Sequence, residues 1–292
     1  MILTMKLSHF LLAASSLFSG YSFADSISLP IWKEETEALG YELPKAIGFN
    51  LSYMGMQQGI NVDSIALQNL QVGSPFLDKL IDKYADIEME AEPGKQISNV
   101  LSLRADVWLF PFLNLYGLVG KLDGYSETNV NVTVSSKKWE ELRYETRFEK
   151  FRLDLDGYTF GGGFVLAGGY GNWFSLVDAS YTQTTLTVVD GSIDAIVISP
   201  RIGYDFHHAG WPARLWLGGM FQNVEQHLTG SIGDLGGDFS GLKGQFEVKQ
   251  HLTSPWNTLA GFQYQVNPSW YLLGEVGFGE RQSFFISLDR RF

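Results

Sequence analysis

The sequence predicts an all-β fold, an antiparallel up-and-down transmembrane β-barrel of about ten strands, within a range of about 8–12. Runs of apolar and polar residues alternate from residue 46 to the end, and each run is long enough to cross a bilayer as a tilted strand. The links between these runs alternate between long and short. The composition, with 32 Gly, 21 Phe, 13 Tyr and 8 Trp, favours aromatic-rich strands joined by tight turns over helices.

The first segment, residues 1–24, is predicted to be a secretory signal peptide. Lys6 precedes an apolar stretch over residues 7–18, and the small residues Ser22 and Ala24 are spaced for cleavage before Asp25. The apolar stretch is shorter than the ~20 residues that a membrane-spanning helix needs. The sequence therefore predicts an exported protein.

The next segment, residues 25–45, is longer than a cleavage spacer and places Trp32 and Leu39 among several glutamates. It is predicted to be either a periplasmic leader or a plug that folds into the barrel mouth. The remaining residues, 46–292, are predicted to form the barrel as one domain.

Composition also restricts the partners. The chain contains no cysteine, so an exported protein of this kind gains its stability from a large core or from a membrane. A net charge of −11 argues against nucleic acid as a partner.

The strands are predicted from alternation and turn signals, of which Asp190-Gly191 is the most specific hairpin signal. The ten predicted strands cover residues 46–57, 99–110, 113–124, 158–170, 173–189, 193–206, 212–224, 256–266, 270–279 and 282–292.

Three long inserts separate strands on the side opposite the short links. In the first, residues 58–95, apolar side chains at helical spacing between Phe76 and Tyr84 predict a short amphipathic helix that caps the barrel mouth. The second, residues 125–156, contains VNVTV and FRLDLD, which are expected to extend the strands beyond the bilayer. The third, residues 225–254, is rich in glycine.

The run at residues 99–110 indicates a membrane barrel most clearly. Leu101, Leu103, Ala105, Val107 and Leu109 take one face, while Ser102, Arg104, Asp106 and Trp108 take the other. A soluble β-sandwich remains the alternative, although its strands average about 5–6 residues. Aromatic residues near the short links predict an interfacial girdle, made of Trp108, Phe110, Phe112, Trp173, Trp211, Trp270 and Phe292.

The terminal strand has Phe284, Ile286, Leu288 and Phe292 on one side and polar residues on the other. With the signal peptide and the amphipathic runs, it resembles the Gram-negative outer-membrane β-barrel proteins, and its ending is similar to the assembly signal of that class. One departure is Arg290, which falls on the outward register. The resemblance implies location in the outer membrane of a Gram-negative bacterium, contact with lipid and lipopolysaccharide, and recognition by the barrel-assembly machinery.

Five charged residues share the inward register at similar heights, namely Arg104, Asp106, Asp178, Arg201 and Glu275. Because buried charges persist when they are paired, we expect a salt-bridge network that fills a narrow lumen. The alternative is a gate or selectivity constriction for a small polar solute.

Two rows of carboxylates in the inserts form a possible cation site, made of Glu88, Glu90, Glu92, Asp154 and Asp156. The alternative is a solvated face that protects a strand edge from aggregation.

Signals for catalysis are weak. His207 and His208 lie in a short turn, and His227 and His251 flank the glycine-rich insert near Asp234 and Asp238. Neither a Gly-x-Ser-x-Gly elbow nor a His-Glu-x-x-His motif is present. We therefore predict a non-catalytic protein without metal or cofactor. Its expected role is surface interaction or envelope structure, with a narrow channel for a small solute and an outer-membrane hydrolase as the alternatives.

Overall fold

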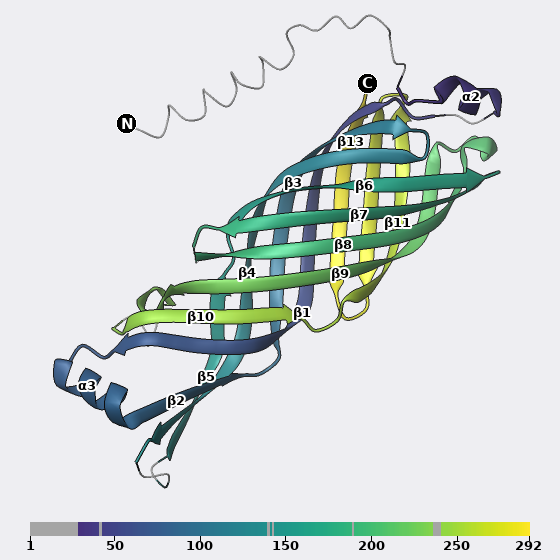
Figure 1. Cartoon of the computed structure of the whole chain (residues 1–292). Coiled ribbons are helices and arrows are strands. Elements are labelled where there is room, and N and C mark those ends of the chain that lie inside the picture. Colours follow the sequence, from purple (N-terminus) through teal and green to yellow (C-terminus); the bar gives the residue numbers. More distant parts are fainter. Residues whose placement is uncertain (1–28, 41–42, 139–140, 142, 189, 236–240) are drawn as a thin grey trace, which may run out of the picture.

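A computed structural model shows how the chain folds (Figure 1). The predicted signal peptide and the first residues of the leader lie outside the part that it describes. The described residues are 29–40, 43–138, 141, 143–188, 190–235 and 241–292.

The fold is an antiparallel ring of ten strands, which confirms the predicted class and architecture (Figure 1). The last strand pairs with the first through Arg291 and Gly48, so the sheet closes on itself. In order around the ring, the strands are β1 (Ile47–Gln71), β3 (Gly94–Phe110), β4 (Leu113–Ser136), β6 (Gly157–Tyr170), β7 (Trp173–Leu186), β8 (Asp190–Asp205), β9 (Ala213–Ser231), β11 (Trp256–Asn267), β12 (Trp270–Phe278) and β13 (Gln282–Arg291).

The outer surface of the ring is apolar because the strands alternate as the sequence predicts. On β3, Leu101 is 52 % exposed on the outside, whereas Asp106 is 5 % exposed inside the barrel. On β13, Phe284, Ile286 and Leu288 face outward in the same way. A ring with this outer surface fits a bilayer, since its closure leaves no unpaired strand edge facing lipid.

Several strands are longer than predicted. β1 has 25 residues and β4 has 24, so the first insert is largely strand rather than a loop. Its first part, GINVDSIALQNLQ, lacks the regular apolar alternation of a lipid-facing strand, which is why the pattern did not reveal it. The strand extension expected in the second insert is confirmed by β4 and by β5 (Arg143–Asp154), which pairs with it.

Three of the strands continue the ring strands across short irregular links. These are β2 (Ala85–Ala91), which leads into β3, β5, which leads into β6, and β10 (Lys243–Leu252), which leads into β11. Both β10 and β11 pair with β9, one above the other. The glycine-rich insert is therefore partly strand as well.

The ring narrows along its axis, because the β12–β13 hairpin ends halfway up. Below its tip, β1 pairs with β13 as far as Gln57 and Gln282. Above it, β1 pairs directly with β10 from Ile60 and Leu252 onward. Loss of β12 and β13 from the ten strands leaves eight at the end away from the leader and the C-terminus, and barrels of about eight strands are narrow enough for side chains to fill. The alternation of long and short links predicts that this end is extracellular and that the opposite end is periplasmic, and the two ends are named accordingly.

Side chains fill this narrow end with an apolar core. Its buried members come from β1, β4, β5, β7, β8, β9 and β10, from the link between β5 and β6, and from the short helix η2 (Ile232–Leu235). Several of them are completely buried, which closes the lumen at this height: Ile60, Leu155 and Leu228.

The predicted helix is confirmed as α3 (Pro75–Tyr84), but it does not cap the mouth. It lies at the far end of β1 and β2, beyond the barrel, and buries none of its residues (Figure 1). The apolar core closes the barrel instead. Around α3, strands β2 and β5 flank the upper half of β4 and form an extracellular arm, defined here as residues 75–91, 125–136 and 143–154.

At the opposite end, the leader forms the short helix α2 (Lys33–Ala38), which packs against the rim. The ring of Trp32 lies 5.0 Å from that of Phe110 and 6.1 Å from that of Phe112. The leader is thus attached to the β3–β4 turn. Among the described residues, no helix has the length and apolar character to cross a membrane.

The periplasmic rim carries exposed aromatic side chains at the short turns, including Phe112, Trp173, Trp211 and Phe292. Trp108 does not belong to this girdle, because it points into the barrel and lines its cavity. Arg290 faces outward as expected, and its guanidinium lies over the rings of Phe292 at 4.6 Å and Trp270 at 5.3 Å.

The predicted orientation, with the long strand extensions outside the cell, can be tested by a labelling experiment. The chain has no cysteine, so a single one can be introduced at Glu145, which is 66 % exposed on the arm, or at His208 in a short turn. We expect a membrane-impermeant maleimide to label Glu145→Cys on intact cells, and His208→Cys only after lysis. The opposite result would reverse the topology.

Candidate functional site in the barrel lumen

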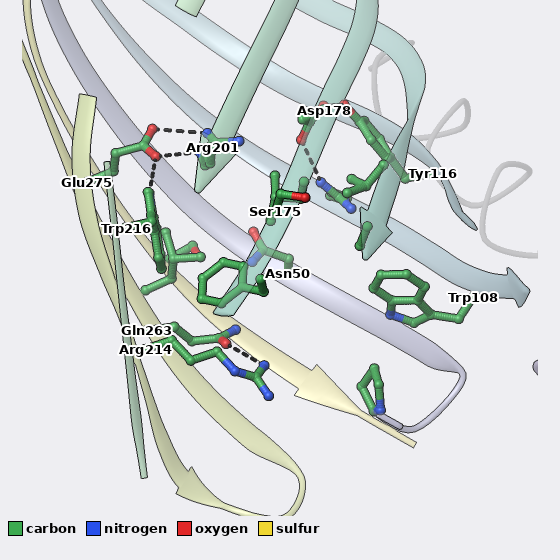
Figure 2. Close-up of a pocket in the computed structure, with 18 of the residues that line it drawn as sticks. Asn50, Trp108, Tyr116, Ser175, Asp178, Arg201, Arg214, Trp216, Gln263 and Glu275 are labelled. Atoms are coloured by element: carbon green, nitrogen blue, oxygen red, sulfur yellow. Dashed lines mark hydrogen bonds and ion pairs between the residues drawn. The ribbon is translucent and has the colours of Figure 1, made fainter. Parts of the chain in front are cut away.

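A cavity of about 660 Å³ occupies the periplasmic half of the lumen (Figure 2). Residues from most ring strands line it, and the leader contributes Thr36, Leu43 and Pro44. Large apolar side chains form much of the wall, among them Leu118, Phe174, Trp216, Met220 and Phe285. The cavity combines this apolar wall with several ion pairs.

One ion pair joins Arg201 on β8 to Glu275 on β12 across the lumen (Figure 2). Arg201 donates from Nε at 2.7 Å and from Nη2 at 3.1 Å to the two carboxylate oxygens. The indole N–H of Trp216 donates to the same carboxylate at 2.8 Å. The side chains are only 16 % and 6 % exposed, so the pair depends on these hydrogen bonds to offset the cost of burial.

A second group surrounds Arg104 on β3. Its guanidinium stacks 3.7 Å from the ring centre of Tyr116 and lies 3.7 Å from the carboxylate of Asp178. The hydroxyl of Tyr116 donates to that carboxylate at 2.5 Å. Arg104 is thereby held against the wall that carries Tyr116 and Asp178, which lie on the opposite side of Figure 2 from Glu275.

A third group extends to the periplasmic rim. Asp106 accepts hydrogen bonds from Asn114 at 2.6 Å and from Arg291 at 2.7 Å. Arg291 also pairs with Asp289 at 3.0 Å, and Arg104 lies 4.0 Å from Asp106. The second and third groups therefore form one continuous network.

All five predicted charged residues lie in the lumen, but they form two separate sets. Arg104, Asp106 and Asp178 belong to the network on one wall, and Arg201 and Glu275 belong to the other pair. No ion pair joins the two sets among the described residues. Sequence reasoning missed the other members, which are Asn114, Tyr116, Trp216, Asp289 and Arg291.

Asp289 and Arg291 lay on the inward register of the terminal strand, which was the available signal. Pairing between β13 and β1, which brings Arg291 beside Asp106, is a long-range contact that no local pattern indicates.

A chain of glutamines crosses the lumen between the cavity and the extracellular end. Gln250 donates to Gln226, and Gln226 donates to Gln96 on β3, each at 2.7 Å. The three side chains are buried. Together with the apolar core, these buried side chains occupy the interior of the barrel beyond the cavity.

A polar cluster marks the periplasmic rim. Asp205 pairs with Arg214 at 2.7 Å and with Nδ1 of His207, whose Nε2 contacts Gln265 at 2.8 Å. Both ring nitrogens of His207 are therefore engaged, and His208 is exposed in the turn.

The histidines of the inserts do not meet in one site. His227 contacts Glu247 at 2.9 Å, and His251 contacts Asp63 at 2.8 Å. Both face outward on the extracellular extension. Asp238 lies outside the described residues, as does the side chain of Asp234.

The insert carboxylates are also dispersed. Glu88 and Glu90 are exposed on β2, Asp154 pairs with Arg152 at 2.8 Å, and Glu92 pairs with Arg147 at 2.8 Å. A hydrogen bond from Asn129 lowers the pKa of Glu92, and Arg147 adds to this effect. The described residues contain no group of three metal-ligating side chains, so the five carboxylates do not form one site.

Asp156 has a different neighbour. A hydrogen bond with Asp123 raises the pKa of the Asp156 carboxyl, because the bond and the nearby negative charge both favour the protonated form. The two carboxyls therefore form a hydrogen-bonded pair in which one proton is shared more readily than between isolated carboxylates.

The closed ring, its apolar outer surface and its charged lumen define an outer-membrane β-barrel protein of the Gram-negative type. No protein-family model matches the chain, and no curated protein matches it in sequence.

Among solved structures, the chain is similar to the COG4313 outer membrane channel from Pseudomonas putida F1 (10% identity, TM-score 0.39, covering 86% of this chain and 97% of that one). It is also similar to the P. putida toluene transporter TodX (7% identity, TM-score 0.32, 85% and 91%). A third is the β domain of the Bordetella autotransporter Brka (10% identity, TM-score 0.33, 85% and 100%). These likenesses are distant, and the class of the protein rests on its own ring of strands.

Proposed function

We propose that this protein is a non-conducting outer-membrane scaffold that presents its extracellular arm as an interaction surface. The observation that carries the proposal is the closed extracellular half of the lumen. Ile60, Leu155 and Leu228 are completely buried there, in a ring narrowed to eight strands by the loss of β12 and β13. An interior packed in this way excludes water and dissolved ions.

The arm supports the second part of the proposal. It extends beyond the closed ring of strands (Figure 1), and one edge of β5 pairs with no other described strand. Positive and negative side chains alternate at every second residue of β5, in the order Arg143, Glu145, Arg147 and Glu149. Charged edges resist uncontrolled strand pairing while leaving polar groups available for a specific partner.

Recognition of the terminal strand by the barrel-assembly machinery is a separate prediction, which rests on the outward-facing apolar residues of β13.

The experiment is conductance in planar lipid bilayers. The purified protein is first refolded and checked for heat-modifiable migration on a gel, and a general porin serves as the positive control. We expect no discrete channel events at either polarity. Reproducible single-channel steps from folded protein would contradict the proposal.

The second candidate is a narrow channel for a small solute, and the cavity of about 660 Å³ favours it. A solute entering from the periplasm would have to pass the glutamine chain and the apolar core. In that case, channel steps would appear in the same experiment, and Arg201→Ala would alter their size because Arg201 lines the cavity.

A further inference from the structure

One arginine in the lumen differs from the others. Arg104, Arg201, Arg214 and Arg291 each pair with a carboxylate. Arg281, in the link between β12 and β13, is 2 % exposed and has no carboxylate partner among the described residues. A buried cation without a counter-charge is costly and is seldom retained without a reason.

The protein gives Arg281 only weak compensation. Its guanidinium donates to the amide oxygen of Gln222 and, at 3.4 Å, to the backbone carbonyl of Met220. Its Nε, although buried, makes no hydrogen bond within the described residues. Both acceptors are uncharged, so the positive charge is not neutralised.

A second buried polar group lies beside the same hairpin. Asn257 is buried, and neither its amide oxygen nor its amide nitrogen has a partner in the described part of the chain. It pairs through the backbone with Met220 and lies next to Gly277 and Gly279 of the hairpin. At either glycine, an added Cβ would come within 3.0 Å of the side-chain amide of Asn257. The absence of a side chain at these two positions therefore leaves space for that amide.

These groups adjoin the upper end of the cavity. Met220 and Ser283 line the cavity. Arg281 donates a hydrogen bond to the backbone carbonyl of Met220 and lies two residues before Ser283 in the chain. The wall there also includes Met54 and Phe285. Methionine side chains are flexible enough to move aside for a ligand.

We propose that this end of the cavity binds a small amphipathic carboxylate. The carboxylate would accept hydrogen bonds from the Arg281 guanidinium and the Asn257 amide, and the apolar part would lie against Met54, Met220 and Phe285. Arginine recognises carboxylates through two parallel N–H donors, which suits a buried anion site. Such a ligand supplies the missing counter-charge.

Ordered water is the other occupant that would satisfy these polar groups. The two occupants differ in charge, and this difference gives the test. We use phenylacetate as the probe and phenylacetamide as its uncharged control, since both carry the same benzyl group.

The protein is reconstituted in lipid nanodiscs, and binding is measured by isothermal titration calorimetry. We expect phenylacetate to bind at least about tenfold more tightly than phenylacetamide, because charge-assisted hydrogen bonds are roughly twice as strong as neutral ones. Arg281→Gln should abolish this difference, because the binding of phenylacetate should weaken much more than that of the uncharged phenylacetamide. Arg152→Gln removes the same charge from an exposed site on β5 and should have no effect.

The inference is overturned if phenylacetate does not bind, if the two probes bind equally, or if the preference for phenylacetate survives in Arg281→Gln. Because the wild-type charge is unpaired, Arg281→Gln should fold at least as well as the wild type. Arg281→Lys provides a second variant, which keeps the charge and should retain part of the preference. Calorimetry reports on this site whatever the conductance experiment shows about the proposed scaffold role.

Discussion

Replacing Glu275 by alanine is expected to lower the free energy of unfolding of the barrel by about 3–5 kcal/mol, the usual cost of breaking a buried ion pair. The change leaves the guanidinium of Arg201 without an anion, and water cannot replace that anion well because the Arg201 side chain is only 16 % exposed. It also removes the acceptor of the Trp216 indole N–H. The free energy of unfolding is measured for the protein in lipid vesicles by titration with guanidinium chloride, with circular dichroism as the signal.

Two further variants test the explanation. Asp154→Ala breaks the exposed Arg152–Asp154 pair and should cause a much smaller loss, because water screens exposed charges. The double variant Arg201→Leu/Glu275→Leu should recover most of the stability, since no charge is then left unpaired. If Glu275→Ala and Asp154→Ala had equal effects, the luminal pair would not be buried as described.

Leu228→Ala is expected to cost about 2–5 kcal/mol, since truncation of a fully buried leucine leaves a cavity in a packed core. Leu228 has no exposed surface and lies in the core that closes the barrel. The matched control is Leu217→Ala on the same strand, because Leu217 is 62 % exposed on the outer face. Lipid chains can fill the space left there, so only the transfer free energy of the lost methyl groups, about 1–2 kcal/mol, should be lost.

Denaturant unfolding in vesicles measures both variants under the same conditions. Similar losses for Leu228→Ala and Leu217→Ala would mean that the extracellular half of the lumen is not tightly packed. That result would also weaken the proposal of a non-conducting barrel, because the proposal depends on this core.

The candidate site was predictable in part. Arg104, Asp106, Asp178, Arg201 and Glu275 were found because a polar residue between apolar neighbours on a strand must face the lumen. Their partners were less visible. Tyr116 and Trp216 also follow the inward register, but the sequence around an aromatic residue in a strand does not indicate that its hydroxyl or indole N–H will donate a hydrogen bond to a carboxylate.

Arg281 was missed for another reason. In the sequence it belongs to a short link, where a charged residue is ordinarily exposed. It is buried only because β1 and β10 continue beyond the hairpin and pair with each other above it. The unpaired charge is therefore a consequence of the sheet topology.

The sequence by itself determined the architecture, because alternation and turn signals are local and a lipid-facing surface requires them on every strand. It predicted ten ring strands, the helix at residues 76–84 and the outward face of the terminal strand. Only the tertiary structure decided how the lumen is closed, which charges pair and where the cavity lies. These depend on the heights at which β10, β12 and β13 end and on the register between distant strands, and residues far apart in the chain set both.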